Sequence, residues 1–257
     1  MSISVSLITK DEEQNIRRTL ESVKWADEIV LVDSGSTDRT CDIAREYGAK
    51  IFTEPWKGFS AQKNSSIEKC TGDWVLSLDA DEEITPALIA ELQSVVKSAD
   101  ACDGYFIRRR NYFMGRWIRW GGGYPDSKLR FFKRGTALFK ERAVHEEMAG
   151  EGKIGLLFGD MLHHAYPNLT LFIEHMNRYS TLGAEINYAK GKSGFSVLNI
   201  VVSPVVRFVY NYIFRAGFLD GREGMLFHLY HSVYMSWKYS KAWELSRAKQ
   251  RAAGAVK

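Results

Sequence analysis

The first hundred residues alternate between two hydrophobic periods, and this alternation most constrains the fold. Short apolar runs at residues 3–8 and 28–32 have the composition of buried strands. Helical spacing follows the first run, where Ile16, Leu20 and Val23 share one face. Further strands are predicted at residues 50–53 and 73–78, and further helices at residues 37–47, 60–70 and from Pro86, with Thr85 as its cap. This rhythm predicts a mostly parallel sheet with helices on both faces.

The chain changes character after residue 100. Residues 105–112, 128–133 and 138–144 have strand-like patterns without helices between them, so we expect mixed or antiparallel strands to extend the sheet. Residues 156–162 predict another strand. Helical patterns follow at residues 169–189, 197–214 and 224–245. We therefore predict an α/β domain over residues 1–165, with halves at 1–100 and 101–165, and a C-terminal helical extension over residues 166–257.

Composition and charge exclude several classes of protein. Hydrophobic residues make up 45% and charged residues 26% of the 257 positions, which is typical of a globular chain and not of a disordered one. A formal net charge of +4 is too small to indicate nucleic-acid binding. The three cysteines are odd in number and widely spaced, which argues against a disulfide framework or a zinc site and favours the cytoplasm. The N-terminus has the pattern of a strand and lacks that of a signal peptide.

Acidic side chains follow three of the predicted strands. They are Glu12 after the first strand, Asp33 after the second, and Asp79 with Asp81 after the fourth. Carboxyl ends of parallel strands open into a crevice where nucleotides bind. A nucleotide diphosphate and a bare acidic pair would repel each other, and a divalent cation such as Mg²⁺ or Mn²⁺ reconciles them. The alternatives are turn and helix capping at Asp33, and a solvated acidic turn at residues 79–83.

Three sequence blocks together resemble a known family. SLITKDEEQNI at residues 6–16, IVLVDSGSTDRT at 29–40 and LSLDADE at 76–82 resemble, in this order and spacing, the family 2 glycosyltransferases. The resemblance implies the GT-A fold, a Rossmann-like mixed sheet flanked by helices. A closer resemblance to the lipopolysaccharide-core β-1,4-glucosyltransferase subgroup continues through KLRFF at 128–132, VHEE at 144–147 and NRYSTL at 177–182.

The resemblance implies roles for the side chains that would bind the nucleotide. Thr9 and Glu12 would line the nucleoside pocket, and Asp33 would meet the uracil or ribose edge. Lys63 would lie near the nucleotide, where the family often carries an arginine-bearing loop, so this lysine is a departure from the pattern. Arg130 would face the donor phosphate.

The resemblance also implies a metal site. Asp81 would be the main metal ligand, and Asp79 would face the ribose or the metal. The family often places a histidine on the metal after the last strand, where this chain has His163 and His164. The subgroup pattern favours His163, while the sequence alone allows either.

A general base is needed as well. Direct displacement at the anomeric carbon inverts its configuration and requires the acceptor hydroxyl to lose its proton. By the family pattern the base is Glu146, with Glu147 in reserve. The alternative is that the two glutamates form a surface acidic turn.

A basic and aromatic cluster lies upstream of these glutamates. It consists of Arg108, Arg109, Arg110, Arg116, Trp117, Arg119 and Trp120. Arginine forks and aromatic platforms would suit a phosphorylated sugar acceptor. The alternative is a solvated strand followed by an aromatic loop.

The helical segment from residue 196 to 215 carries one narrow polar stripe on an apolar surface. The stripe consists of Ser196, Asn199, Ser203, Arg207, Asn211 and Arg215. Such a helix is either buried in a core or set into a membrane interface. Arg207 and Pro204 interrupt the apolar run, so we do not expect it to span a membrane. The aromatic and basic residues that follow favour peripheral contact with the inner face of the cytoplasmic membrane, and the alternatives are a homo-oligomer interface or a cap on the catalytic domain.

These features predict an inverting hexosyltransferase. We expect it to move glucose from UDP-glucose onto a lipid-linked saccharide, such as the lipopolysaccharide inner core, with Mg²⁺ or Mn²⁺. One alternative is a transferase acting on a polyprenyl phosphate, although those enzymes usually add clear membrane spans. Another is a non-catalytic nucleotide-sugar or glycan-binding protein, which would bind UDP and metal but release no sugar.

Overall fold

The computed structural model describes residues 1–140, 147–150 and 152–254. The chain forms two compact units. Unit 1 contains Met1–Arg110 and Pro125–His164, and unit 2 contains Asn111–Tyr124 and Ala165–Lys257. The division of the sequence at residue 165 into a catalytic domain and an extension stays a prediction, and the two units are described separately.

The parallel strands of unit 1 form as the sequence predicts. They are β1 (Ile3–Thr9), β2 (Glu28–Asp33), β3 (Lys50–Thr53) and β4 (Trp74–Asp79). β1 pairs in parallel with both β2 and β4, and β2 pairs in parallel with β3. Every residue of β2 is buried, which explains its continuous apolar sequence.

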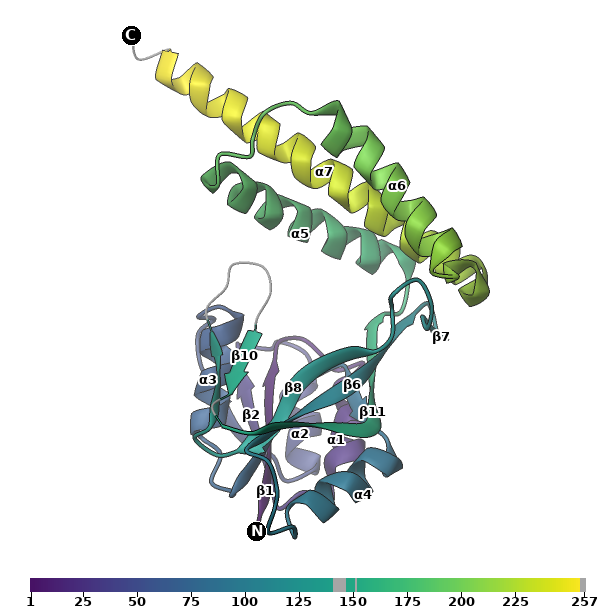
Figure 1. The fold of residues 1–257 in the computed structure, drawn as a ribbon. Helices are drawn as coiled ribbons and strands as arrows, with labels where there is room; N and C mark the ends of the chain where they lie inside the picture. Colours follow the sequence, from purple (N-terminus) through teal and green to yellow (C-terminus); the bar gives the residue numbers. More distant parts are fainter. Residues whose placement is uncertain (141–146, 151, 255–257) are drawn as a thin grey trace. The chain divides into compact units, whose positions relative to one another are not determined.

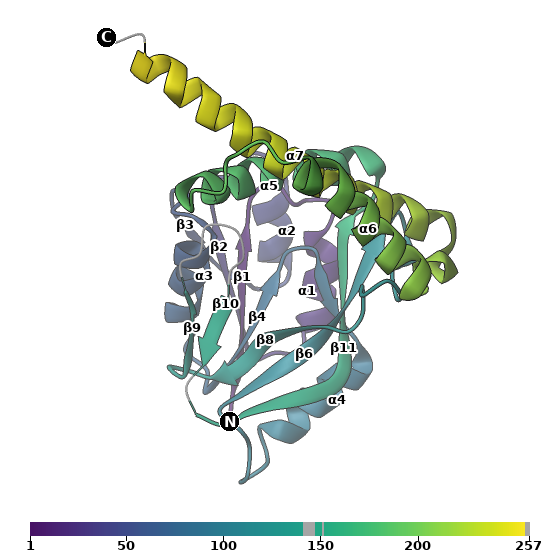
Figure 2. The same ribbon diagram turned by 45° about the horizontal axis from the view of Figure 1, so that its top comes forward.

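Antiparallel strands extend this sheet and confirm the expected mixed topology. They are β5 (Glu82–Ile84), β6 (Gly104–Phe113), β8 (Asp126–Lys133) and β11 (Ile154–Tyr166). The strand order is β3-β2-β1-β4-β8-β6-β11-β5, which can be followed from β3 to β11 in Figure 2. β9 (Ala137–Lys140) and β10 (Glu147–Gly150) form a separate antiparallel pair. β5, β10 and the two-residue β7 (Arg116–Trp117) were not predicted, because such short strands carry no readable period.

Helices cover both faces of the unit 1 sheet, as predicted. α1 (Ile16–Val23), α2 (Thr40–Glu46) and α4 (Pro86–Val95) share one apolar core with the sheet, in which Leu7 and Leu31 are fully buried. α3 (Phe59–Glu68) packs on the opposite face through Ile67, which joins Val30 and Val75. The Thr85 hydroxyl accepts a hydrogen bond from the Leu88 amide at 3.3 Å and caps α4.

Unit 2 is built from helices around an aromatic core. α5 (Leu169–Ala189) has the predicted bounds, and α7 (Gly221–Gly254) packs against it. The predicted helix at 197–214 forms as a continuous run of η1 (Leu198–Val202), α6 (Ser203–Val209) and η2 (Tyr210–Phe214), followed by η3 (Gly217–Asp220). α5 and this run flank α7 (Figure 1). Among the described helices, none is both long and apolar enough to cross a membrane.

Glu28 is a buried carboxylate at the start of β2. It accepts hydrogen bonds from the Ser4 hydroxyl, from the Thr71 amide at 2.7 Å and from the Lys50 ammonium at 2.7 Å. Burial raises the pKa of Glu28, but these hydrogen bonds outweigh it and lower the pKa to about 2. A carboxyl with a lowered pKa in the folded chain stabilises the fold at neutral pH. That stabilisation is lost as the pH falls through the range between its ordinary value of 4.5 and about 2.

We expect Glu28→Gln to lower the free energy of unfolding by about 1–3 kcal/mol at neutral pH, because it removes a buried charge to which Ser4, Lys50 and Thr71 donate hydrogen bonds. It should also flatten the dependence of that free energy on pH between 4.5 and 2. Urea unfolding at a series of pH values measures both effects. Glu46→Gln is the matched control, since the Glu46–Arg17 pair is exposed, and its effect should stay below about 1 kcal/mol. An unchanged pH profile in Glu28→Gln would contradict the assignment.

Candidate active site

The three predicted strand-end motifs meet at one edge of the sheet. Strand register places Thr9 opposite Asp33 and Ile8 opposite Asp79. The parallel direction of β1, β2 and β4 brings their carboxyl ends together. The Thr9 hydroxyl is buried and has no hydrogen-bond partner among the described residues. A buried hydroxyl of this kind is available to a ligand.

Asp33 holds its own turn. One of its carboxylate oxygens accepts hydrogen bonds from the Gly35 and Ser36 amides, both at 2.9 Å. The other accepts from the Ser36 hydroxyl at 2.5 Å. Asp38 similarly accepts from the Thr40 amide at 3.0 Å, at the start of α2. The turn alternative therefore describes what Asp33 does within the chain, and its contact with a nucleoside stays a prediction.

Glu12 lies close to the acidic strand-end groups. Burial raises its pKa, and this outweighs the hydrogen bond from Asn15, which lowers it. The charges of Asp81 and Asp38 raise the pKa further. The sequence prediction that the first and fourth strand-end motifs share one site is thereby consistent with the electrostatics of unit 1.

Asp79 is held between two cations. Its Oδ1 lies 2.7 Å from Lys63 Nζ, and its Oδ2 lies 2.7 Å from Arg130 Nη2. Both cationic side chains are largely buried, with 8% and 6% of their surface exposed. Burial raises the pKa of Asp79, but Arg130 and Lys63 outweigh it and hold the pKa well below its ordinary value. Three residues predicted from distant parts of the sequence are thus in direct contact.

Asp81 faces a histidine that lies near the end of β11. β11 pairs antiparallel with β5 and places His163 opposite Glu82. His163 Nε2 lies 3.4 Å from Asp81 Oδ2, whereas His164 Nε2 lies 3.3 Å from Glu83 Oε2. Alternation of side chains along a strand explains why only one of the two adjacent histidines meets Asp81. Burial raises the pKa of Asp81, and the His163 interaction more than reverses this.

The Asp81–His163 pair has the chemistry of a divalent metal site. A carboxylate oxygen and an imidazole nitrogen are ligands that Mn²⁺ accepts, and Mg²⁺ accepts the carboxylate. Asp79, the other predicted ligand, has both oxygens in ion pairs with Lys63 and Arg130. In the described part of the chain, no three His, Cys, Asp or Glu side chains form a metal-binding cluster. A cation at Asp81 and His163 would therefore complete its coordination with oxygens of a ligand and water.

The candidate general base cannot be placed with the other groups. Glu146 lies outside the described residues, and Glu147 is described only as the first residue of β10. Both assignments stay predictions.

Glu82 is a central residue that the sequence analysis missed. It is fully buried, and its Oε2 accepts a hydrogen bond from the Asp79 amide at 2.9 Å. Its Oε1 accepts from Arg130 Nη2 at 3.2 Å and from Arg109 Nη1 at 3.1 Å. Arg109 in turn lies 2.7 Å from Asp126. The result is a chain of alternating charges along this edge of the sheet: Lys63, Asp79, Arg130, Glu82, Arg109 and Asp126.

The arginines of β6 form ion pairs with acidic side chains of unit 1. Arg109 belongs to the charge chain, and Arg110 Nη2 lies 2.5 Å from Asp160 Oδ2. Arg108 Nε lies 3.5 Å from the other oxygen of Asp160. These arginines are therefore not a purely solvated strand, and their contact with an acceptor stays a prediction.

Comparison with known proteins identifies the family. The sequence profile described as "Glycosyl transferase family 2" matches residues 4–148, more than half of the chain. The chain belongs to this family. The protein is therefore a glycosyltransferase that uses a nucleotide sugar, as the sequence resemblance predicted. The blocks at residues 6–16, 29–40 and 76–82 all fall within the matched region.

Two relatives cover nearly the whole chain. The lipopolysaccharide core biosynthesis glycosyltransferase LpsC of Rhizobium meliloti (strain 1021) is 28% identical over 98% of this chain and 95% of its own length. The uncharacterized glycosyltransferase RT0209 of Rickettsia typhi is 29% identical over 95% of this chain and 87% of its own.

Solved structures confirm the predicted GT-A fold. The mannosyltransferase PcManGT from Pyrobaculum calidifontis, in complex with GDP-Man and Mn²⁺, superposes with a TM-score of 0.57 at 14% identity. That match covers 94% of this chain and 86% of the other. Residues 1–349 of S. aureus TarS, in complex with UDP-GlcNAc, give a TM-score of 0.50 at 15% identity over 97% of this chain and 92% of the other.

We expect Glu82→Gln to weaken nucleotide binding several-fold, because Arg130 and the Asp79 amide lose the charge that holds them. The free energy of unfolding should fall by about 1–3 kcal/mol, since Arg109 and Arg130 keep Asp126 and Asp79 as partners. Calorimetric titration with UDP and urea unfolding measure the two effects. Glu83→Gln is the matched control, because Glu83 contacts His164 instead of the charge chain. Equal nucleotide affinity in both variants would show that Glu82 has no part in the site.

Proposed function

We propose that this family 2 glycosyltransferase is an inverting hexosyltransferase that moves glucose from UDP-glucose onto a lipid-linked saccharide, such as the lipopolysaccharide inner core. The observation that carries the proposal is the pairing of Asp81 with His163 beside the Lys63–Asp79–Arg130 ion pairs. This arrangement puts metal-binding and phosphate-binding chemistry at the edge of the sheet where nucleotides bind.

The nucleoside end of the donor is assigned to the neighbouring strand ends. The unpartnered Thr9 hydroxyl offers a hydrogen bond. Asp33 ends β2 opposite Thr9, and Glu12 follows the end of β1. Two structural relatives with this fold were solved with nucleotide sugars, one with GDP-Man and Mn²⁺ and one with UDP-GlcNAc. These complexes support a nucleotide-sugar donor, and the choice of UDP-glucose comes from the subgroup resemblance.

The diphosphate is assigned to the metal and the two buried cations. Mn²⁺ or Mg²⁺ at Asp81 and His163, when bound, stabilises the negative charge of the departing diphosphate. Lys63 and Arg130 donate to phosphate oxygens, and Asp79 keeps both cations at the sheet edge between turnovers. Glu82 accepts a second hydrogen bond from the same Arg130 nitrogen and helps to hold it in place.

Proton removal from the acceptor is assigned to Glu146, with Glu147 in reserve. Attack of the acceptor hydroxyl on the anomeric carbon forms the new glycosidic bond and breaks the bond to the diphosphate. The hydroxyl proton passes to the carboxylate of the base.

The name of one relative supports the proposed acceptor and its location. LpsC bears the name of a lipopolysaccharide core glycosyltransferase, which supports a lipid-anchored saccharide as acceptor. We propose that the protein works at the inner face of the cytoplasmic membrane as a peripheral protein, because such an acceptor is confined there.

We expect Asp81→Ala to abolish the Mn²⁺-dependent part of UDP binding, because it removes the only carboxylate proposed to hold the metal. His163→Ala should weaken that binding by about tenfold or more. His164→Ala, whose imidazole contacts Glu83, is the matched control and should bind UDP as the unaltered protein does. Calorimetric titration with UDP, with and without Mn²⁺, measures these effects. Undiminished Mn²⁺-dependent binding of UDP by Asp81→Ala would contradict the assignment of Asp81 as a metal ligand.

We expect Glu146→Gln to retain affinity for UDP and to lose roughly 10²–10⁴-fold in the rate of sugar transfer, because an amide cannot accept the proton. Glu147→Gln should transfer sugar at close to the original rate. Release of UDP, measured with UDP-, GDP- and ADP-sugars in the presence of Mn²⁺ and a core saccharide acceptor, reports the rate and the preferred donor. A reversed order of the two variants would move the base to Glu147. Metal and UDP binding without release from any donor would instead indicate a non-catalytic binding protein.

A further inference from the structure

The helical run from residue 198 to 214 has an exposed apolar side and a polar side that is partly buried. Four residues of its polar stripe, Ser196, Asn199, Ser203 and Asn211, are half-buried, whereas Arg207 and Arg215 are exposed at its border. η1 and α6 pack against α7, so this polar side faces the rest of unit 2. The large apolar side chains of the run are exposed: Val197, Leu198, Val201, Val202, Val205, Val206, Val209, Tyr210, Ile213 and Phe214. A helix folded for water alone has the reverse arrangement.

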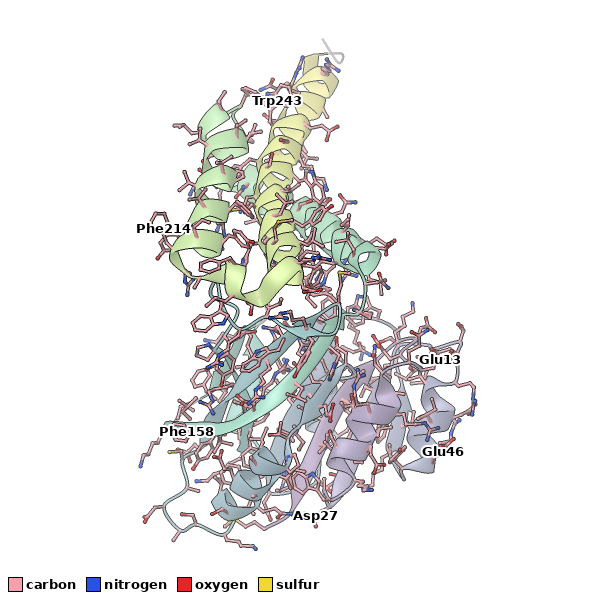
Figure 3. All side chains as sticks on the ribbon, turned by 90° about the vertical axis from the view of Figure 1, so that its right-hand side faces the viewer. Glu13, Asp27, Glu46, Phe158, Phe214 and Trp243 are labelled. Atoms are coloured by element: carbon pink, nitrogen blue, oxygen red, sulfur yellow. The ribbon has the colours of Figure 1, made fainter. Side chains whose placement is uncertain are left out.

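The exposed apolar residues are concentrated in this one segment. Half of the large apolar side chains that are exposed in the described chain lie within residues 195–219. Leu198 is 67% exposed and Phe214 is 76% exposed, and Figure 3 shows Phe214 pointing away from α7. α5, in the same unit, buries Phe172 and Met176 in the normal way. Contiguous apolar surface on this scale is uncommon on soluble monomers and marks an interaction site.

The charges of this segment identify the partner. Residues 186–219 include Lys190, Lys192, Arg207 and Arg215 and contain no aspartate or glutamate. Arg207 and Arg215 are exposed within the same segment as the aliphatic side chains. An apolar face in a segment whose only charged residues are cations is complementary to acyl chains beneath anionic headgroups. A second copy of this chain, meeting the same patch across a two-fold axis, would set cations against cations.

We propose that residues 195–219 form a lipid-docking surface, with the aliphatic face of the η1–α6–η2 run inserted among the acyl chains of an anionic bilayer. The run then lies in the plane of the interface, and Arg207 and Arg215 contact phosphate groups of the lipids. This inference rests on the proposed function only for its biological purpose, which is to hold the enzyme where its acceptor lies. The surface itself is independent of the sugar-transfer chemistry.

Vesicle flotation of the full chain tests the surface. The probes are vesicles of phosphatidylcholine alone and of phosphatidylcholine with phosphatidylglycerol. We expect the protein to float with the anionic vesicles, and added salt should weaken but not abolish this binding, since insertion does not depend on charge. The triple variant Val201→Gln, Val205→Gln, Ile213→Gln should bind anionic vesicles at least about tenfold more weakly than the unaltered protein. The reason is that three apolar side chains no longer enter the bilayer.

A matched control carries the same number of changes at exposed apolar residues elsewhere. Leu138→Gln, Leu156→Gln and Leu171→Gln together replace side chains that are 45–48% exposed, and this variant should float like the unaltered protein. Val206→Glu is a second, single change that places a negative charge on a residue that is 59% exposed. It should lower flotation with anionic vesicles even if the triple variant fails to fold.

Three results would overturn the proposal. They are flotation of Val206→Glu and the triple variant at the original level, absence of flotation of the unaltered protein with anionic vesicles, and self-association through this patch. Sedimentation velocity detects the last as a dimer that the triple variant loses. UDP binding, measured on the same samples, separates the two proposals. Absence of UDP binding by the unaltered protein would undermine the proposed function. Absence of its flotation with intact UDP binding would undermine the docking surface alone.

Discussion

The ion pairs of Asp79 are the interaction on which the rest of the site depends. Its two oxygens each lie 2.7 Å from a buried cation, Lys63 from α3 and Arg130 from β8. Asp79 thereby ties a helix on one face of the sheet to an antiparallel strand beside β4. Glu82 contacts the Asp79 amide and Arg130, so the turn after β4 is held at both its start and its end. Buried charges persist only when such partners compensate their desolvation.

This arrangement divides the work between two aspartates that are separated by one residue. Asp79 has both oxygens in ion pairs with Lys63 and Arg130, whereas Asp81 lies 3.4 Å from His163. The two aspartates of the Asp-X-Asp pattern therefore have different partners within the chain. The metal-binding role of Asp81 and the phosphate-binding role of the two cations stay proposals.

Unit 2 buries its apolar side chains in a different way from unit 1. Unit 1 buries its apolar residues on both sides of a sheet, with Leu7 and Val30 on opposite faces. Unit 2 buries an aromatic core around Phe172 but leaves the outer face of α6 aliphatic and exposed. The exposed apolar surface and the cationic charge of residues 186–219 are the observations from which the lipid-docking surface is proposed.

The sequence by itself determined the parallel half of the sheet, the bounds of α5 and the meeting of Thr9, Asp33 and Asp79. Those features follow from local periodicity and from the rule that parallel strands end at one edge. It did not reveal Glu82 as a central residue, nor which of His163 and His164 meets Asp81. Both depend on the β5–β11 pairing, which joins residues about eighty positions apart through a three-residue strand. Only tertiary structure could decide them, because long-range pairing leaves no periodic signal in so short a segment. The same reason applies to the 198–214 run: its polar stripe was legible in the sequence, but the side that faces α7 was settled only by packing.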